Sequence, residues 1–341
     1  MAFEKVKEII KESPSFTTST DLAAERLGGK VLYATDDFFA EKENLIKPGR
    51  GIFIADKYTD RGKWMDGWES RRKRIPGHDW CIVQLAAPGM IKGFDIDTNF
   101  FLGNHPPHAS IEAALIQDEL SIENWENVQW KEILPKSSLD AGSQNFFSCT
   151  VPEVFSHIRL HIYPDGGVAR LRVYGDIYKV WTDLDTKVEI DLAAAINGGK
   201  AIACNDMFFS SMNNLIMPGR GINMGDGWET KRNRTPNNKD WVIVKLATQG
   251  VIERIVVDTH HFKGNYPDRC SIEYCTAKHD KDVIEGKVHW QTLLPEQKLE
   301  ADAEHEYKQQ INEHIAATHV RLNIFPDGGV SRLRLFGKIK L

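Results

Sequence analysis

The sequence predicts an all-β protein built from two tandem, jelly-roll-like antiparallel β-sandwich domains. Three observations predict this fold class. Most of the first half of the chain recurs in the second half. Within each copy, short segments alternate apolar and polar residues, which is the pattern of a strand with one buried face. Loops rich in Gly, Pro, Asn and Asp separate these segments, with few long helical stretches between them, which favours antiparallel sheets.

Length and composition agree with two folded domains. The chain has 341 residues, of which 41% are apolar and 27% charged, as in ordinary globular proteins and unlike disordered ones. The net charge is −5, so there is no basic excess that would hold a nucleic acid. No apolar run approaches the roughly 20 residues of a membrane-spanning helix. We therefore expect neither a nucleic-acid partner nor a membrane.

The N-terminal segment and the cysteines predict a cytoplasmic location. Residues 1–14 mix charged side chains with Val6, Ile9 and Ile10, so they predict a short amphipathic helix ending near Pro14 and lack the apolar centre of a signal peptide. An odd number of cysteines without Cys-x-x-Cys spacing argues against a disulfide framework or a zinc cluster. These cysteines are Cys81, Cys149, Cys204, Cys270 and Cys275. None of them recurs in the other copy, so we expect buried thiols rather than a nucleophile.

The internal duplication divides the chain. Residues 44–52 return as 214–222 at an offset of 170, whereas residues 66–69 return as 226–229 at an offset of 160. The first copy therefore carries ten extra residues between positions 52 and 66. A period this long indicates complete domains rather than solenoid repeats. The predicted parts are an N-terminal extension over 1–14, a first domain over 15–176, a linker over 177–185 and a second domain over 186–341.

Strands are predicted where the two-residue alternation is clear. In the first copy apolar residues alternate with His157, Arg159 and His161, and the second copy repeats the pattern over residues 320–324. Further strands of the first copy are predicted at 80–85, 91–96, 110–116 and 169–174.

One loop in each copy is unusually rich in acids, arginines and tryptophans. The retained pairs are Asp66 and Asp226, Trp68 and Trp228, Glu69 and Glu229, Arg72 and Arg232, Arg74 and Arg234, and Asp79 and Asp240. Arginine forks match carboxylates, and acidic side chains accept N–H groups, so the loop could bind a small polar molecule. The alternative is an ion-pair network that ties the loop to its sandwich, with the tryptophans in the core.

Other retained polar residues follow predicted strands. Asp97 and Asn104, with their copies Asp258 and Asn265, could face a cleft at the end of a sandwich or could cap a loop. Each Pro-Asp-Gly-Gly-Val stretch, at 164–168 and 326–330, predicts a turn between strands.

Two arginines follow each of these turns. Arg170 and Arg172, like Arg332 and Arg334, share one strand face and need anions, which could be structural carboxylates or a ligand. The histidines near 105–108 and 260–261 are not retained between copies, so no metal site is predicted.

The order of these motifs resembles the allantoicase family. The matching motifs, present in both copies, are Gly-Gly-Lys, Asn-Leu-Ile, Asp-Gly-Trp-Glu-(Ser/Thr)-(Arg/Lys)-Arg, Asp-Trp, Asp-Thr-x-x-Phe-x-Gly-Asn, Ser-Ile-Glu and (Tyr/Phe)-Pro-Asp-Gly-Gly-Val-x-Arg. The resemblance covers nearly the whole chain beyond the N-terminal extension. It implies tandem jelly-roll domains that hydrolyse allantoate to ureidoglycolate and urea, in purine and allantoin degradation for nitrogen recovery. No metal or organic cofactor is needed for that route.

This chemistry assigns expected roles to the retained residues. Glu69 or Glu229 would act as the base, with Asp66 and Asp226 in the same catalytic loops. Substrate binding is expected from Arg72, Arg74, Arg232 and Arg234 for the carboxylate, from Asp97, Asn104, Asp258 and Asn265 for the ureido groups, and from Trp68 and Trp228.

Some questions stay open at the level of sequence. The insertion, with Tyr58, Asp60, Arg61 and Lys63, lies in the first copy only, so the two sites cannot be identical. One copy could be catalytic and the other structural, or both could contribute to one site. The alternative function is a non-catalytic tandem protein that binds a small molecule or a carbohydrate, because fold alone does not decide function. A homo-oligomer is compatible with either function, the hydrolase or the binding protein.

Overall fold

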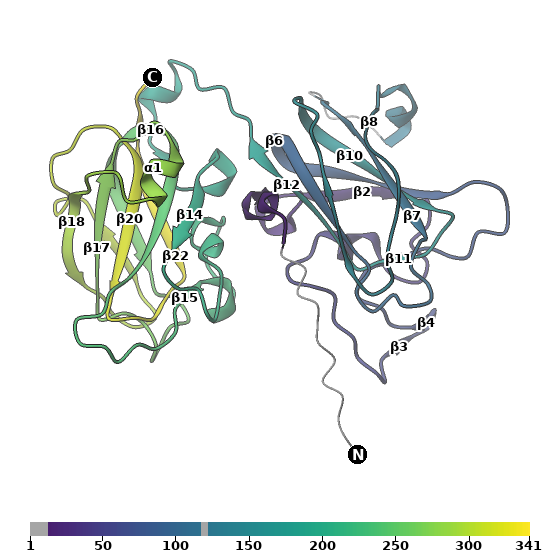
Figure 1. Cartoon of the computed structure of the whole chain (residues 1–341), viewed down its shortest axis with the longest axis horizontal. Coiled ribbons are helices and arrows are strands. Elements are labelled where there is room, and N and C mark those ends of the chain that lie inside the picture. The colour runs from purple at the N-terminus through teal and green to yellow at the C-terminus, as the bar shows by residue number, and fades with distance from the viewer. Residues whose placement is uncertain (1–12, 117–121) are drawn as a thin grey trace.

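The structure is a computed structural model that describes residues 13–116 and 122–341. Each copy forms its own β-sandwich, and the two sandwiches lie side by side, joined by one connecting segment (Figure 1). The helix predicted over residues 1–14 lies outside the described residues, except for its last two positions. The description starts just before a short 3₁₀-helix, Ser15–Thr18.

Twelve strands are described in the first repeat. They are β1 (Thr20–Asp21), β2 (Lys30–Ala34), β3 (Tyr58–Thr59), β4 (Gly62–Lys63), β5 (Trp68–Glu69), β6 (Asp79–Asp97), β7 (His108–Ala114), β8 (Lys131–Ser138), β9 (Gln144–Ser148), β10 (Val154–Tyr163), β11 (Gly167–Val168) and β12 (Arg170–Ile177). Further 3₁₀-helices of this repeat are Glu25–Leu27, Lys42–Ile46 and Ile122–Asn127.

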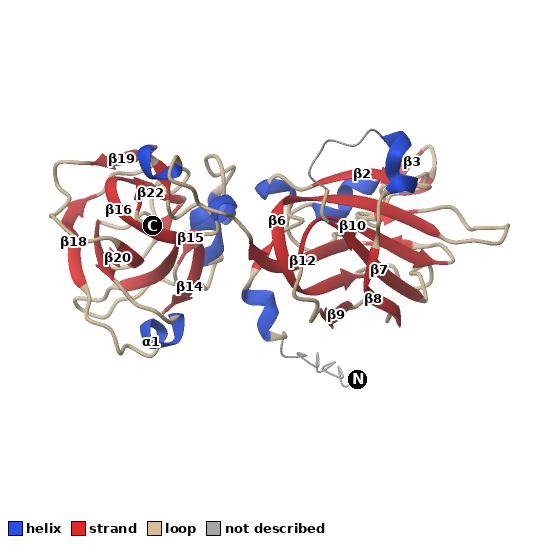
Figure 2. Ribbon diagram, turned by 90° about the horizontal axis from the view of Figure 1, so that it is seen from above, coloured by secondary structure: helices blue, strands red, loops and turns tan. Residues whose placement is uncertain are grey.

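The second repeat has the same arrangement without the hairpin β3–β4. Its strands are β13 (Ile190–Asp191), β14 (Lys200–Cys204), β15 (Trp228–Glu229), β16 (Asp240–Asp258), β17 (Arg269–Cys275), β18 (Gln291–Lys298), β19 (Glu304–Tyr307), β20 (Ala317–Phe325), β21 (Gly329–Val330) and β22 (Arg332–Ile339). Its helices are the α-helix α1 (Asp280–Ile284) and the 3₁₀-helices Asp185–Lys187, Ala195–Asn197, Met212–Ile216 and Met224–Asp226. Figure 2 shows how little of either repeat is helical.

The long strand β6 connects the two layers of the first sandwich. Its first half pairs with β2 and β10, whereas its second half pairs with β12 and β9, all antiparallel. Side chains from both halves, such as Val83 and Ile96, enter one hydrophobic core. In the second repeat β16 pairs in the same way with β14, β20, β22 and β19.

The predicted fold class is confirmed, but one strand division is wrong. The segments 80–85 and 91–96 were expected to be separate strands with a loop between them, and Pro88 and Gly89 lie in that interval. The backbone instead stays extended through this stretch, and the pairing with β10 merely shifts register there. Such a bulge bends a strand without ending it, which lets one strand serve both layers.

The two repeats contact each other through ion pairs and apolar packing. Arg26 of the first repeat pairs with Asp226 of the second, and Lys200 of the second pairs with Asp176 of the first. Leu27 packs into the core of the second repeat. Arg26, Leu27 and Asp226 lie in short 3₁₀-helices, whereas Asp176 and Lys200 belong to β12 and β14, which lie on the facing sides of the two repeats in Figure 1.

Candidate active site

Glu69 is held rigidly at one end of the first sandwich. Its strand, β5, pairs with β11, where Glu69 lies opposite Gly167, and its backbone also bonds to Ala40 on the other side. Side chains alternate along a strand, so Trp68 enters the core while Glu69 points the other way. The structure thus fixes the carboxyl group at the surface of a packed domain, half-buried rather than on a mobile loop.

The glycines of the Pro-Asp-Gly-Gly-Val turn bring Asn104 next to Glu69. A side chain at Gly167 would collide with the buried ring of Phe101, at about 2.0 Å, and Gly166 has a φ of +139°. The close approach lets the Gly167 N–H donate to the Asn104 carbonyl over 2.8 Å. The Asn104 side-chain amide then donates to Glu69 Oε1 over 2.7 Å. The turn predicted from sequence therefore also positions a polar pair.

The environment of Glu69 favours its protonated form more than water does. Burial raises the pKa of the Glu69 carboxyl, and the hydrogen bond from Asn104 offsets part of this increase. A carboxylate with a raised pKa is a stronger base than an ordinary glutamate, which suits proton transfer near neutral pH.

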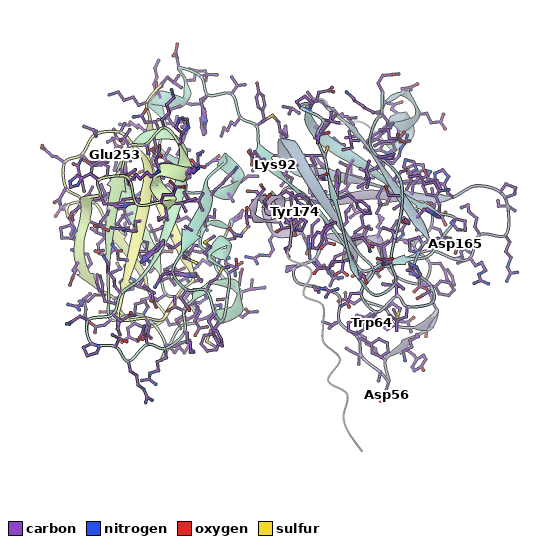
Figure 3. The ribbon with its side chains drawn as sticks, viewed as in Figure 1. Asp56, Trp64, Lys92, Asp165, Tyr174 and Glu253 are labelled. Carbon is purple, nitrogen blue, oxygen red and sulfur yellow. The ribbon has the colours of Figure 1, made fainter. Side chains whose placement is uncertain are left out.

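The insertion forms a hairpin beside this carboxyl group. Strands β3 and β4 pair through Tyr58 and Lys63, and the hairpin lies at the end of the repeat near Asp56 and Trp64 (Figure 3). Residues of the hairpin and of the sandwich loops line a hollow of about 360 Å³. Its lining includes Glu69, Asn104, Arg61, Lys63, Phe39, Met65, Phe100 and Leu102.

The two cations of the hairpin have no carboxylate partner among the residues that the structure describes. Arg61 donates to the carbonyl of Phe38 over 3.1 Å, and Lys63 to that of Ala55 over 2.8 Å. Lys63 also lies over the Phe53 ring, 4.7 Å from its centroid. The hollow therefore combines a carboxyl group, an amide and two cations whose charge is not neutralised by a neighbouring acid.

The second repeat preserves the polar pair but not the cations. Glu229 is bridged to Ser210 and lies opposite Gly329, and Asn265 donates to Glu229 over 2.5 Å. In place of the hairpin stands the 3₁₀-helix Met224–Asp226, whose Met224 sulfur is 3.8 Å from the Asn265 amide. The duplicated loop thus gives two similar pairs in different surroundings.

Asp66 and Asp226 belong to structural ion pairs. Asp66 bonds Arg170 over 2.7 Å and accepts the Ile52 N–H over 2.9 Å. Asp226 pairs with Arg332 over 2.8 Å and also with Arg26. Both carboxylates are largely buried and neutralised, so the geometry supports the ion-pair alternative for these two residues rather than a catalytic role.

Asp97 does not lie with Asn104. It is buried at the end of β6, where Arg50 clamps it with two hydrogen bonds of 2.8 and 2.9 Å. Asp258 is held by Arg220 in the same way, over 3.0 and 3.1 Å. The carboxylates of Asp97 and Asp258 thus have charged partners of their own, and Asp97 does not line the hollow that contains Asn104.

The remaining expected binding residues are also separate from the hollow. Trp68 and Trp228 have no exposed surface and donate their indole N–H groups to backbone carbonyls, so they pack the core and do not contact a ligand. Arg72, Arg74, Arg232 and Arg234 are exposed on loops and do not line the hollow around Glu69.

The second arginine after each turn also has a structural partner. Arg172 donates to the carbonyls of Lys47 and Gly49 and lies 3.5 Å from Asp21. Arg170 likewise pairs with Asp66. The anions that neutralise Arg170 and Arg172 are therefore carboxylates of the protein.

The cysteines are free and lie buried or half-buried in the structure. All five cysteines are free thiols, and burial raises the pKa of Cys204 and Cys275 to about 11. Within residues 13–116 and 122–341 no group of three or more His, Cys, Asp or Glu side chains is arranged to hold a metal ion. In the same residues no helix is long and apolar enough to span a membrane.

Sequence reasoning gave no role to Arg61 and Lys63 at Glu69. It compared the two copies and favoured what both retain, whereas these cations lie in the insertion. The position of the insertion directly before the Asp-Gly-Trp-Glu motif did indicate that the two sites differ, but it did not show that these two cations line a hollow with Glu69.

The fold and the site define a tandem β-sandwich protein with a small hollow, lined by both charged and apolar side chains, at one end of its first repeat. A family model described as an allantoicase repeat matches residues 20–178 and again residues 190–340. The chain belongs to the allantoicase family.

Individual relatives agree over nearly the full length. The chain is 52% identical over 326 residues to a probable allantoicase of Pseudomonas fluorescens strain Pf0-1, covering 95% of this chain and 97% of that protein. It is 51% identical over 330 residues to a probable allantoicase of Photobacterium profundum, covering 96% and 99%. The crystal structure of allantoicase from Saccharomyces cerevisiae is 39% identical, with a TM-score of 0.79 over 94% of this chain and 93% of that one.

Proposed function

We propose that this protein hydrolyses allantoate to ureidoglycolate and urea, and that the reaction takes place in the hollow around Glu69. Family membership supports the activity. The observation that carries the location is the half-buried Glu69 carboxyl, bonded to Asn104 and flanked by Arg61 and Lys63. No comparison favours the carbohydrate-binding alternative. The cytoplasmic location and a homo-oligomeric state stay predictions.

The contents of the hollow match the groups of the substrate. Allantoate carries one carboxylate and two ureido groups on a single carbon. Lys63 and Arg61 would attract the carboxylate, because they are the cations of the hollow. The Asn104 side-chain oxygen would accept a ureido N–H, while its amide keeps its bond to Glu69. In this arrangement Arg61 and Lys63 bind the substrate carboxylate, in place of Arg72 and Arg74.

A single ionised carboxylate can complete the reaction. Glu69 takes the N–H proton of the retained ureido group and gives it to the nitrogen of the leaving one. The bond from carbon to the leaving nitrogen breaks, urea departs neutral, and a carbon–nitrogen double bond forms on the retained side. Glu69 then takes a proton from a water molecule while the water oxygen bonds to the carbon. Glu69 gives this proton to the retained nitrogen. Atoms and charge balance, and Glu69 ends ionised.

The second repeat is proposed to have a supporting role. Its pair of Glu229 and Asn265 lacks the hairpin cations, and Met224 lies at the amide instead. An anionic substrate would therefore find less attraction there. This asymmetry makes Glu229 a natural control for Glu69.

The direct test is incubation of the purified protein with allantoate, while urea and ureidoglycolate are measured over time. Equal amounts of the two products, formed at the same rate before and after treatment with a chelator, are expected. Absence of turnover, with and without added divalent metal, would reject the proposed activity.

Replacing Lys63 by Met is expected to raise KM for allantoate by about tenfold with a smaller change in kcat, because the substrate carboxylate loses a charge-assisted bond of about 1.5–3 kcal/mol. Lys231, exposed on the matching end of the second repeat, provides the control variant Lys231→Met. Steady-state kinetics over a range of allantoate concentrations make the comparison. An unchanged KM in Lys63→Met would remove this residue from the site.

Replacing Asn104 by Ala is expected to move the acid limb of the kcat/KM profile to higher pH. The reaction needs ionised Glu69, so activity falls as the pH drops through the pKa of this carboxyl, which burial already raises. Without the amide hydrogen bond the carboxylate is less stable and its pKa rises further. Asn265→Ala should leave the limb in place. A limb that stays fixed in both variants would mean that another group controls it.

A further inference from the structure

A second cavity lies between the two repeats, away from the hairpin hollow. Its volume is about 390 Å³. Asp95, Gln144 and Tyr174 line it from the first repeat, and Lys200 and Met217 line it from the second. Tyr174 lies on the side of the first repeat that faces the second (Figure 3). Because both repeats contribute, the cavity exists only in the two-domain protein.

The cations around this cavity already have carboxylate partners. These ion pairs are Arg50 with Asp97, Arg170 with Asp66, Arg172 with Asp21, Arg26 with Asp226, and Lys200 with Asp176. The cavity therefore differs from the hollow at Glu69, where two cations lack such partners among the described residues. A ligand that carries a net negative charge would have to break an existing ion pair here, which is costly for buried groups.

Three buried polar atoms of the lining residues lack a hydrogen-bond partner; one of them, Arg26 Nη2, has its charge paired with Asp226, and the other two belong to Asp95 and Arg170. Asp95 is 2% exposed; its Oδ2 accepts from Gln144 over 2.6 Å, whereas its Oδ1 has no partner. Arg170 is 3% exposed, and its Nε has no partner. Such atoms are rare in folded proteins and usually have a specific reason. The Asp95 atom is an acceptor and the Arg170 atom a donor.

The second repeat has no acid at the position of Asp95. Asp95 lies opposite Arg172 in the pairing of β6 with β12, and the same position opposite Arg334 in the second repeat holds Val256. Tyr174 is likewise replaced by Phe336. A valine thus fits this sheet position, and the sandwich does not require the acid.

We infer that the cavity between the repeats is a second binding site, for a small uncharged ureido or amide compound. An N–H of such a compound would donate to Asp95 Oδ1, and its carbonyl oxygen would accept from Arg170 Nε. A ureido group carries this donor and acceptor side by side and adds no charge. The inference goes beyond the proposed function and does not depend on it, since the donor and acceptor set alone defines the ligand class.

The pKa of Asp95 agrees with a carboxyl group that lacks one hydrogen-bond donor. Burial raises its pKa to about 7; the hydrogen bond from Gln144 opposes this increase, the neighbouring Asp97 adds to it, and Arg172 and Arg50 lower the pKa to a smaller extent. The carboxyl group is therefore poorly stabilised as an ion by the protein alone. An N–H donor from a ligand would supply the missing stabilisation.

The test measures binding of N-methylurea to the whole protein by ligand-observed NMR, with acetate as a charged probe. Asp95→Val installs the residue of the second repeat, Asp95→Asn keeps an acceptor, and Glu69→Gln is the control for the hairpin hollow. We expect saturable N-methylurea binding in the wild type, in Glu69→Gln and in Asp95→Asn, and a loss of affinity of at least tenfold in Asp95→Val. Acetate binding should be the same in the wild type and Asp95→Val.

Turnover of allantoate separates this site from the catalytic one. Asp95→Val, shown to be folded by its circular dichroism and thermal unfolding, should keep kcat/KM within about threefold of the wild type. Unchanged N-methylurea binding in Asp95→Val, binding lost in Glu69→Gln alone, or turnover abolished in folded Asp95→Val would each overturn the inference. If the wild type binds N-methylurea through Asp95 but does not hydrolyse allantoate, the inference stands and the proposed function fails.

Discussion

Replacing Glu69 by Gln lowers kcat for allantoate by about 10²–10⁴-fold, the usual contribution of a positioned general base. Glutamine keeps the size of the side chain and can still bond to Asn104, so the fold and the hollow should persist. What is lost is the ability to carry a proton between the two nitrogens of the substrate. Glu229→Gln, the same change at the matching strand position of the second repeat, should leave kcat within a few-fold of the wild type. Rates of urea release from the two variants make the comparison.

The pair of variants also tests where the reaction takes place. A large loss in Glu229→Gln with near-normal Glu69→Gln would place the chemistry in the second repeat and leave the hairpin cations without the proposed role. Equal large losses would mean that both repeats contribute to turnover. Circular dichroism and thermal unfolding of each variant exclude misfolding as the cause of a lost rate.

Replacing Asp226 by Ala destabilises the protein by about 3–5 kcal/mol, as expected when one partner of a buried ion pair is removed. Asp226 neutralises two guanidinium groups, Arg332 within its own repeat and Arg26 from the other. Without it, the buried Arg332 keeps its charge but loses its counter-ion. Denaturant unfolding measures the change, and Asp66→Ala, which removes the partner of one guanidinium only, should cost less.

Activity under native conditions decides between the two interpretations of Asp226. An ion-pair role predicts that the folded fraction of Asp226→Ala still turns over allantoate. If stability stayed the same while turnover disappeared, the catalytic assignment expected from sequence would be right and the structural one wrong.

Much of the fold follows from sequence because duplication and alternation are both visible in one chain. The pairing of similar segments predicted two similar sandwiches, and the two-residue period identified the buried faces of strands such as residues 158–162. The continuity of β6 was missed, because Pro88 and Gly89 signal a turn in isolation, whereas the pairing partners on either side keep the strand extended.

The site was predictable only in part. Glu69 and Asn104 were both chosen from sequence, and they lie in contact. Asp97 was grouped with them because it is retained and polar, but its contact with Arg50 depends on how the loop after residue 46 folds back over the sheet. Retention in both copies says that a residue matters to the shared fold. It therefore selected structural ion pairs as readily as chemistry, it passed over Asp95, and it assigned no binding role to Lys63, although the insertion that contains Lys63 was recognised as a difference between the copies.

The pairing of β1 with β12 has a consequence for synthesis. These strands come from opposite ends of the first repeat, since Thr20 lies beside Gly175. The second half of β6 also pairs with β12. The ribosome has therefore made most of the repeat before this part of the sheet can form. During that interval the apolar face of β6 is exposed in the nascent chain. We expect folding of the first repeat to begin late, and aggregation of truncated chains that end before residue 170.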